Sequence, residues 1–413
     1  MIDTAGDMLR ALVTALVLLA GCSPHRDDAR VGAWREDLHA LATELPRRHV
    51  DAFARVTEAD WRRAVDALDQ RLPGLDDAHV EVELARLVAA IGDAHTQIKV
   101  VGRTEPYPLA LVWFEDGIFV IGSRAEDRWA VGRKVVEVNG HRIDEVIAAL
   151  TPLIPRNNEA WLHAELPGWL VDPVVLAGLD LSPIDRATFE LAGTDGTVRD
   201  LELRPTGGRE VAIVPPATLP LHLRAPARGL NYWNTYVAAD RLIYFAYNAC
   251  ANDTRAGSVA TFAATTLAFV DRNPVDRFVI DLRNNGGGNS ELLRPLIDGL
   301  ASRPALAGRV FVIIGMHTFS SAVLDAILLK TQAHATLVGG PTGGKPSSFG
   351  EVKTFELPRS HLGVQYSTKR FSFPELPNDS LEPDLPVKVF AADWFSGRDP
   401  AVDAILAAAL PAR

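Results

Sequence analysis

Hydrophobic residues in the first hundred positions recur three or four residues apart, which places them on one face of a helix. Thr57 with Asp60 is typical of a helix start, and Pro73 with Gly74 is typical of an end. We therefore predict an N-terminal helical region over residues 23–103. Its three apolar stripes are Trp34, Leu38, Leu41 and Leu45, then Trp61, Val65, Leu68 and Leu72, then Leu84, Leu87, Val88 and Ile91.

From residue 104 the pattern changes to short apolar runs separated by Gly, Asp and Asn. Residues 109–121 read as a hairpin around Asp116–Gly117, residues 132–140 as a strand entering an Asn-Gly turn, and residues 187–204 as a second hairpin. Residues 143–150 look helical, whereas residues 155–183 show no clear periodicity. This pattern predicts a β-rich module over residues 104–206.

The last two hundred residues alternate apolar runs with helix-like segments. Strands that are covered on both faces read as nearly continuous apolar runs, and βαβ crossovers place helices between them. We therefore predict a layered α/β domain over residues 207–413. The expected strands are 242–246, 278–282, 310–314 and 335–338, and the expected helices are 257–270, 290–302 and 321–331.

Composition and charge narrow the function classes. A chain of 413 residues is long enough for two or three domains. The net charge of −10 and the lack of a dense Lys/Arg cluster argue against a nucleic-acid partner. The 11 histidines show no paired metal-ligand spacing, so we expect no metal and no cofactor.

The N-terminus resembles a lipoprotein leader. The apolar stretch Ala11–Ala20 has the length of a signal-peptide core, and Leu19-Ala-Gly-Cys22 resembles the bacterial lipobox. The resemblance implies a signal peptide over residues 1–22, lipidation at Cys22, and a cell-envelope protein that faces the periplasm or the exterior. Asp3 and Asp7 depart from the usual positive start, which a start at Met8 would restore. A buried helix is the alternative. The other cysteine, Cys250, is expected to be a small core residue.

Three turns that follow predicted strands carry candidate chemistry. Three glycines in Arg283–Gly288 suit either a tight turn or a nest of backbone N–H groups that binds a negative oxygen. Ser320 and Ser321 stand where a strand meets a helix, as a helix cap or as a nucleophile. Lys345 follows the glycines of the third turn and is a candidate base if its pKa is depressed.

These three blocks, Arg283–Gly288, Thr318–Ala322 and Gly340–Lys345, resemble the signature blocks of the S41 peptidases, the tail-specific proteases and their tricorn-like relatives. The resemblance implies a crotonase/ClpP-like catalytic core with a PDZ-like module, and peptide hydrolysis through a serine acyl-enzyme. In tail-specific proteases the nucleophile precedes the lysine by 25 positions, which selects Ser320. Gly287 and Ser321 would then supply N–H groups to the oxyanion.

The resemblance leaves two bases open. Lys345 matches the lysine of tail-specific proteases, whereas His95, in Gly92–Thr96, matches a histidine of the tricorn-like branch, with Glu382 as its carboxylate partner. Val323 and Thr331 depart from the usual acidic residues of the motif.

We therefore predict a lipid-anchored serine endopeptidase whose partner is a peptide or protein substrate and whose only membrane contact is the lipid. The alternatives are a non-catalytic lipoprotein that binds peptides on a decayed S41 scaffold, and an esterase or amidase. The sequence does not indicate the substrate or the oligomeric state.

Overall fold

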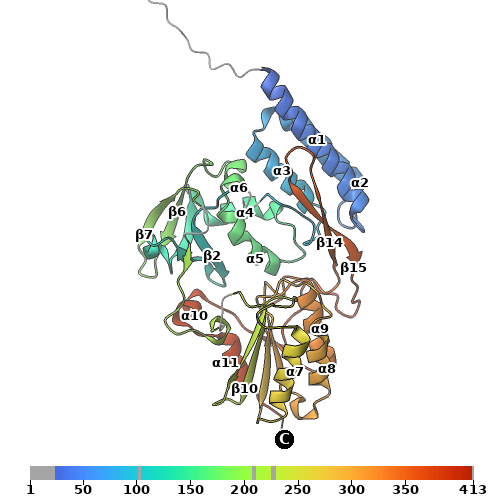
Figure 1. Cartoon of the computed structure of the whole chain (residues 1–413). Coiled ribbons are helices and arrows are strands. Elements are labelled where there is room, and N and C mark those ends of the chain that lie inside the picture. The colour runs from blue at the N-terminus through green and yellow to red at the C-terminus, as the bar shows by residue number, and fades with distance from the viewer. Residues whose placement is uncertain (1–23, 101–103, 207–210, 225–228, 412–413) are drawn as a thin grey trace, which may run out of the picture.

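The computed structural model describes residues 24–100, 104–206, 211–224 and 229–411, so Cys22 lies outside the described residues. The chain begins with three helices: α1 (Pro24–Arg48), α2 (Glu58–Arg71) and α3 (Asp77–Ala89) (Figure 1). The Thr57 hydroxyl accepts a hydrogen bond from the Asp60 N–H and caps α2. The predicted N-terminal helices are therefore confirmed. In the described part of the chain, no helix has the length and apolarity needed to cross a membrane.

The middle of the chain builds a sheet in the order β2-β3-β4-β6-β7. Both predicted hairpins are present, as antiparallel pairs β2–β3 and β6–β7. The Asn-Gly turn after β4 has positive φ at Asn139 and Gly140, at 49° and 79°. The strands are β2 (Leu109–Phe114), β3 (Gly117–Ser123), β4 (Lys134–Val138), β5 (His141–Arg142), β6 (Ala187–Ala192), β7 (Val198–Leu203) and β8 (Ala212–Ile213).

Helices cover this sheet. The predicted α4 (Ile143–Leu150) is present, and the stretch without clear periodicity forms α5 (Glu159–Leu170) and α6 (Pro173–Gly178). Helix α5 buries apolar side chains around much of its circumference and contains Pro167, so its sequence has no single apolar stripe.

The N-terminal helices and the middle sheet share one hydrophobic core, which also takes in residues 357–366. Those residues belong to the hairpin of β14 (Phe349–Glu356) and β15 (Gly363–Arg370), which pairs with β1 (Gln97–Ile98). The hairpin reaches from the C-terminal part of the chain up to the N-terminal helices (Figure 1). Residues 92–96 therefore lie next to a segment more than 250 positions later.

The C-terminal part is a six-stranded sheet in the order β16-β13-β12-β11-β10-β9, parallel except for β9. Its strands are β9 (Tyr232–Val237), β10 (Leu242–Tyr247), β11 (Arg277–Asp281), β12 (Val310–Ile314), β13 (Thr336–Gly339) and β16 (Leu385–Pro386).

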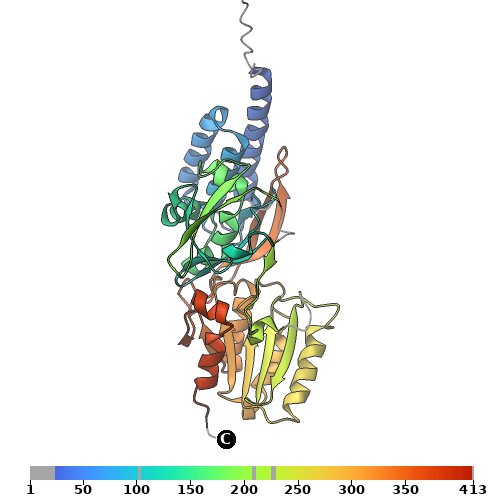
Figure 2. The same cartoon turned by 90° about the vertical axis from the view of Figure 1, so that its left-hand side faces the viewer.

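Helices lie on both faces of that sheet (Figures 1 and 2). One face packs on α7 (Val259–Val270), α8 (Arg294–Ala301) and α9 (Ser321–Gln332). The other packs on α11 (Pro400–Ala407), which follows α10 (Ala391–Ser396). The predicted alternation of strands and helices is confirmed. Because β11, β12 and β13 are parallel, the turns that follow them meet at one edge of the sheet.

Candidate active site

Ser320 occupies a strained position at the start of α9. Its φ of 55° and ψ of −125° lie outside the backbone regions that residues other than glycine favour. Such a conformation costs on the order of 1–3 kcal/mol and persists only where the surrounding structure enforces it. Its hydroxyl makes no capping hydrogen bond, and that of Ser321 donates to the Gly288 carbonyl at 2.6 Å. Neither serine hydroxyl therefore caps the helix.

The triple-glycine turn packs directly against this serine. A Cβ on Gly287 would lie 2.7 Å from the Ser320 Cβ and 3.0 Å from the Ser321 nitrogen. A Cβ on Gly288 would lie 2.4 Å from the Cys250 carbonyl oxygen. Both glycines have positive φ, at 105° and 134°. The turn thus needs glycine at two positions, for close approach as well as for conformation.

The backbone N–H groups of the turn have different partners. The Gly287 N–H donates to the Asn285 Oδ1 at 2.9 Å, so this N–H, predicted to bind an oxyanion, is already engaged. Among the described residues, the N–H groups of Gly288 and Ser321 have no acceptor. The Ser321 N–H is also the first of helix α9, where the helix dipole favours a negative charge. The arrangement offers these two donors in place of Gly287.

The turn that carries Lys345 contacts the serine, and the lysine itself is ion-paired. A Cβ on Gly344 would lie 3.0 Å from the Ser320 nitrogen, so the third turn passes over the start of α9. The Lys345 ammonium forms an ion pair with Asp379. The ion pair engages the Lys345 side chain with Asp379, and the structure shows no hydrogen bond from it to Ser320 among the described residues.

His95 is buried and neutral beside the serine motif. Its imidazole centroid lies 4.4 Å from that of the Phe319 ring, and the Phe319 ring also stacks on Trp161 of α5, at 3.9 Å between centroids. Burial lowers the pKa of His95, although the nearby Asp93 carboxylate opposes this. In the described part of the chain neither ring nitrogen has a hydrogen-bond partner. A neutral imidazole with a free nitrogen is able to accept a proton.

Asp93 anchors the loop that carries His95. Its Oδ2 accepts hydrogen bonds from Thr96 and Ser367, both at 2.6 Å, and lies 3.1 Å from the His49 Nε2. Burial alone would raise the pKa of Asp93, but the His49 contact, the electrostatic influence of the nearby His95 ring and the two hydroxyls bring it to about 2. Its Oδ1 lies 3.9 Å from the His95 Nδ1. Sequence reasoning missed this residue, although it stands two positions before the predicted histidine.

Glu382 is exposed and forms no hydrogen bond or ion pair with any residue that the structure describes. The carboxylate nearest to the His95 ring is that of Asp93. The structure therefore brings together Ser320, Gly287, Ser321, Lys345 and His95 around one edge of the sheet, and it leaves Glu382 at the surface.

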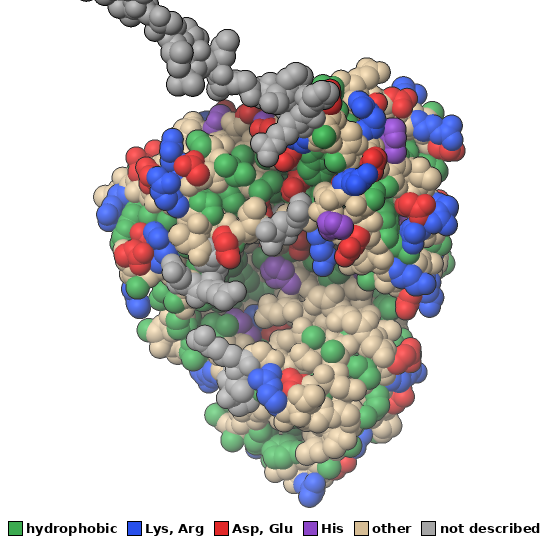
Figure 3. All heavy atoms as spheres, turned by 45° about the horizontal axis from the view of Figure 1, so that its top comes forward, with side chains coloured by type: hydrophobic (Ala, Val, Ile, Leu, Met, Phe, Trp, Pro, Cys, Tyr) green, Lys and Arg blue, Asp and Glu red, His purple; other side chains and the backbone are tan. Residues whose placement is uncertain are grey.

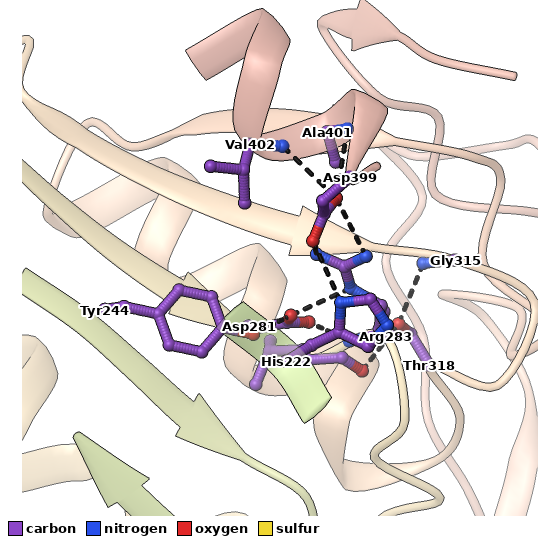
Figure 4. A network of polar contacts seen from close by, with 10 residues as sticks. His222, Tyr244, Asp281, Arg283, Gly315, Thr318, Asp399, Ala401 and Val402 are labelled. Carbon is purple, nitrogen blue, oxygen red and sulfur yellow. Dashed lines mark hydrogen bonds and ion pairs between the residues drawn. The ribbon is translucent and has the colours of Figure 1, made fainter. Parts of the chain in front are cut away.

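A buried ionic network holds the first turn in place (Figure 4). Arg283 donates to Asp281 at 2.8 Å and to both oxygens of Asp399 at 3.1 and 3.0 Å. Asp399 also accepts from His222 at 3.0 Å and caps α11. Tyr244 donates to Asp281. The two carboxylates hold the pKa of Arg283 above its usual value, although burial opposes this. The arginine of the predicted block is thus a structural anchor that ties β11 to α11.

The molecular surface is hollowed between the upper and lower parts of the molecule, and histidine side chains lie in this hollow (Figure 3). The polar side chain of Asn158, the N-cap of α5, spans the two parts: its Nδ2 donates to the carbonyls of Thr342 and Gly343 at 3.1 Å and of Asp379 at 2.7 Å. The turn that carries Lys345 is thereby tied to the middle module.

Comparison with solved structures finds a similar fold in other proteins. Mature CPAF in complex with lactacystin matches with a TM-score of 0.63 and 14% identity, over 91% of this chain and 97% of that one. Mature CPAF alone matches with a TM-score of 0.61. The photosystem II D1 C-terminal processing protease matches with a TM-score of only 0.41 and 15% identity, over 90% of this chain and 98% of that one.

No family model matches the sequence, and no curated protein matches it either. At 14% identity the likeness to CPAF concerns the fold and leaves the activity open. Over most of its length, the chain has a mixed α/β fold similar to that of CPAF, an S41 protease, as its three turn motifs predicted.

Proposed function

We propose that the protein is a serine peptidase of S41 type, in which Ser320 attacks the peptide carbonyl and forms an acyl-enzyme. The observation that carries this proposal is the strained Ser320 at the N-terminus of α9, pressed against Gly287. Strain of this kind concentrates at functional sites, and a nucleophile at a sharp strand-to-helix turn presents its oxygen to the substrate. The likeness to mature CPAF supports it at the level of the fold.

The N–H groups of Ser321 and Gly288 would bind the oxygen of the tetrahedral intermediate. Both are without an acceptor among the described residues, and they come from the two segments that meet at Ser320. Preorganised donors of this kind lower the barrier by about 3–4 kcal/mol each. Gly287 would act through its lack of a side chain, because its own N–H is engaged by Asn285.

His95 is favoured over Lys345 as the base. The Lys345 ammonium is paired with Asp379, whereas burial keeps the His95 imidazole neutral and its nitrogens are free. Base catalysis needs the unprotonated form at the working pH. The His95 nitrogens and the Ser320 hydroxyl form no hydrogen bond with each other in this structure without substrate. Catalytic hydrogen bonds often form only in the complex with substrate, so in this proposal substrate binding brings the two groups into contact.

A serine-directed fluorophosphonate probe tests the proposal, with mapping of the labelled peptide and a parallel assay on unstructured peptides. We expect labelling at Ser320 and its loss in Ser320→Ala, with the exposed Ser302→Ala as the matched control. A folded wild-type protein that neither reacts nor cleaves would support the alternative, a peptide-binding protein on a decayed scaffold. Preference for esters over peptides would support the esterase alternative.

We further propose that the core is crotonase/ClpP-like, that residues 104–206 act as a PDZ-like module for an extended peptide, and that the protein is anchored in the cell envelope through Cys22. The support for the anchor is the apolar stretch and lipobox-like residues of the leader. Metabolic labelling with a fatty acid tests it, since Cys22→Ala would abolish incorporation.

A further inference from the structure

A second polar cluster adjoins the glycine turn. It contains the Cys250 thiol, the Asn285 amide and the Asp325 carboxyl, all of them buried. The Cys250 Sγ lies 3.3 Å from the Asp325 Oδ2 and 3.5 Å from the Asn285 Oδ1. Asn285 in turn accepts from the Gly287 N–H at 2.9 Å and donates to the Tyr247 carbonyl at 2.8 Å. The cluster is therefore continuous with the turn.

The backbone of Cys250 reinforces this connection. Its N–H donates to the Gly287 carbonyl at 2.9 Å, and its carbonyl accepts from the Asn289 N–H at 2.7 Å. Asp325 stands one helical turn after Ser321 on α9. The cluster thus joins the end of β10, the glycine turn and the first turns of α9, which are the segments that define the candidate oxyanion site.

The number of protons available for hydrogen bonds in the cluster constrains the protonation state of the Asp325 carboxyl group. A thiol carries one proton, but two oxygen acceptors face the Cys250 sulfur. If the carboxyl group is protonated, it donates to the sulfur, and the thiol proton is free for the Asn285 oxygen. If the carboxyl group is ionised, it accepts the hydrogen bond from the thiol. The Asn285 oxygen, which orients the Gly287 N–H, then loses the thiol as a donor and faces a buried charge.

We propose that Asp325 is a positioning residue whose protonated carboxyl group holds the glycine turn in place through Cys250 and Asn285. This inference rests on the proposed function only for its effect on the reaction of Ser320. The effect on the turn itself follows from the contacts alone.

The environment of Asp325 agrees with a neutral carboxyl group. Its Oδ1 has no hydrogen-bond partner within the described residues, and its side chain is fully buried. Burial raises the pKa of Asp325 to about 8, with a further contribution from the charge of Glu291 and an opposing one from the Cys250 contact. Burial likewise raises the pKa of Cys250 and of the neighbouring Tyr247, so both stay protonated. A buried carboxyl without a cation is expected to be neutral.

Hydrogen exchange of the Gly287 amide tests the inference without any assay of activity. In Asp325→Asn the side chain is uncharged at every pH and retains a donor for the sulfur. We expect equal protection in the wild type and this variant at about pH 6.5, and exchange about tenfold faster in the wild type at about pH 9.5. Asp298→Asn, an exposed change of the same kind on α8, should match the wild type throughout. Equal exchange in the wild type and Asp325→Asn at high pH would overturn the inference.

Probe labelling of Ser320 is the second measurement. The ratio of wild-type to Asp325→Asn labelling rates should be near one at about pH 6.5 and should fall about tenfold by about pH 9.5. A constant ratio, or a large loss in Asp325→Asn at low pH, contradicts a positioning role for the neutral group. If neither protein is labelled at any pH while the exchange difference is present, the proposed peptidase fails and the role of Asp325 in the turn stands.

Discussion

Gly287 and Ser320 touch across the candidate site: a Cβ on the glycine would lie 2.7 Å from the serine Cβ. We expect Gly287→Ala to push the serine out of place and to strain a backbone with φ of 105°. The cost should be about 2 kcal/mol in the free energy of unfolding, together with loss of probe labelling.

Gly286 offers the matched control for that change, because a Cβ there meets no atom within 4 Å. Gly286→Ala should leave the free energy of unfolding within about 1 kcal/mol of the wild type, as measured by urea denaturation. Equal effects of the two substitutions would show that the contact with Ser320 is unimportant.

Replacing the histidine should separate the two candidate bases. His95→Gln removes the neutral acceptor and should slow labelling of Ser320 by about a hundredfold or more. Lys345→Gln removes a cation that is already paired with Asp379 and should have a much smaller effect. Because burial lowers the pKa of His95, the wild type should keep its reactivity below the pH at which a free histidine is half protonated. The reverse order of the two variants would identify Lys345 as the base.

The backbone strain at Ser320 predicts a cost to stability. Glycine adopts positive φ without a steric penalty, although it loses more conformational entropy on folding. Ser320→Gly should therefore be more stable than Ser320→Ala by about 1 kcal/mol, and neither variant should react with the probe. Thermal and urea unfolding of the two variants measure the difference. A more stable alanine variant would mean that the backbone at this position is relaxed.

The Asp93 carboxylate should make the fold sensitive to acid. Its pKa is about 2 in the folded protein against 3.8 as the ordinary value, so its contribution to stability is present above about pH 4 and is lost as the pH falls through 2. The wild type should lose about 2 kcal/mol more than Asp93→Asn over this interval. Urea denaturation at each pH tests this, and parallel losses would contradict it.

The ionic network behind the first turn should be important for stability. Asp399→Asn leaves the Arg283 guanidinium with a single carboxylate and should cost about 3 kcal/mol. The same substitution at Asp298, in an exposed pair with Arg294, should cost less than about 1 kcal/mol. Equal losses would show that the buried pair contributes no more than a surface pair.

The sequence by itself determined the local elements and the type of chemistry. Helical stripes, alternating runs and Asn-Gly turns are local patterns, and they predicted α1 to α4, both hairpins and strands β10 to β13 of the C-terminal sheet. The glycine, serine and lysine blocks predicted a shared edge, because turns after parallel strands must meet there. Helices α5 and α6 escaped prediction because they are buried around most of their surface and carry no amphipathic period.

Only the tertiary structure decided which groups are free to react. The engaged N–H of Gly287, the Lys345–Asp379 pair and the exposure of Glu382 all depend on contacts between segments far apart in the chain. The same holds for Asp93 and Asp325, whose protonation depends on burial and partners that no spacing along the chain encodes. Residue types fix what chemistry is available, whereas reactivity depends on solvation and hydrogen bonding, which exist only once the chain has folded.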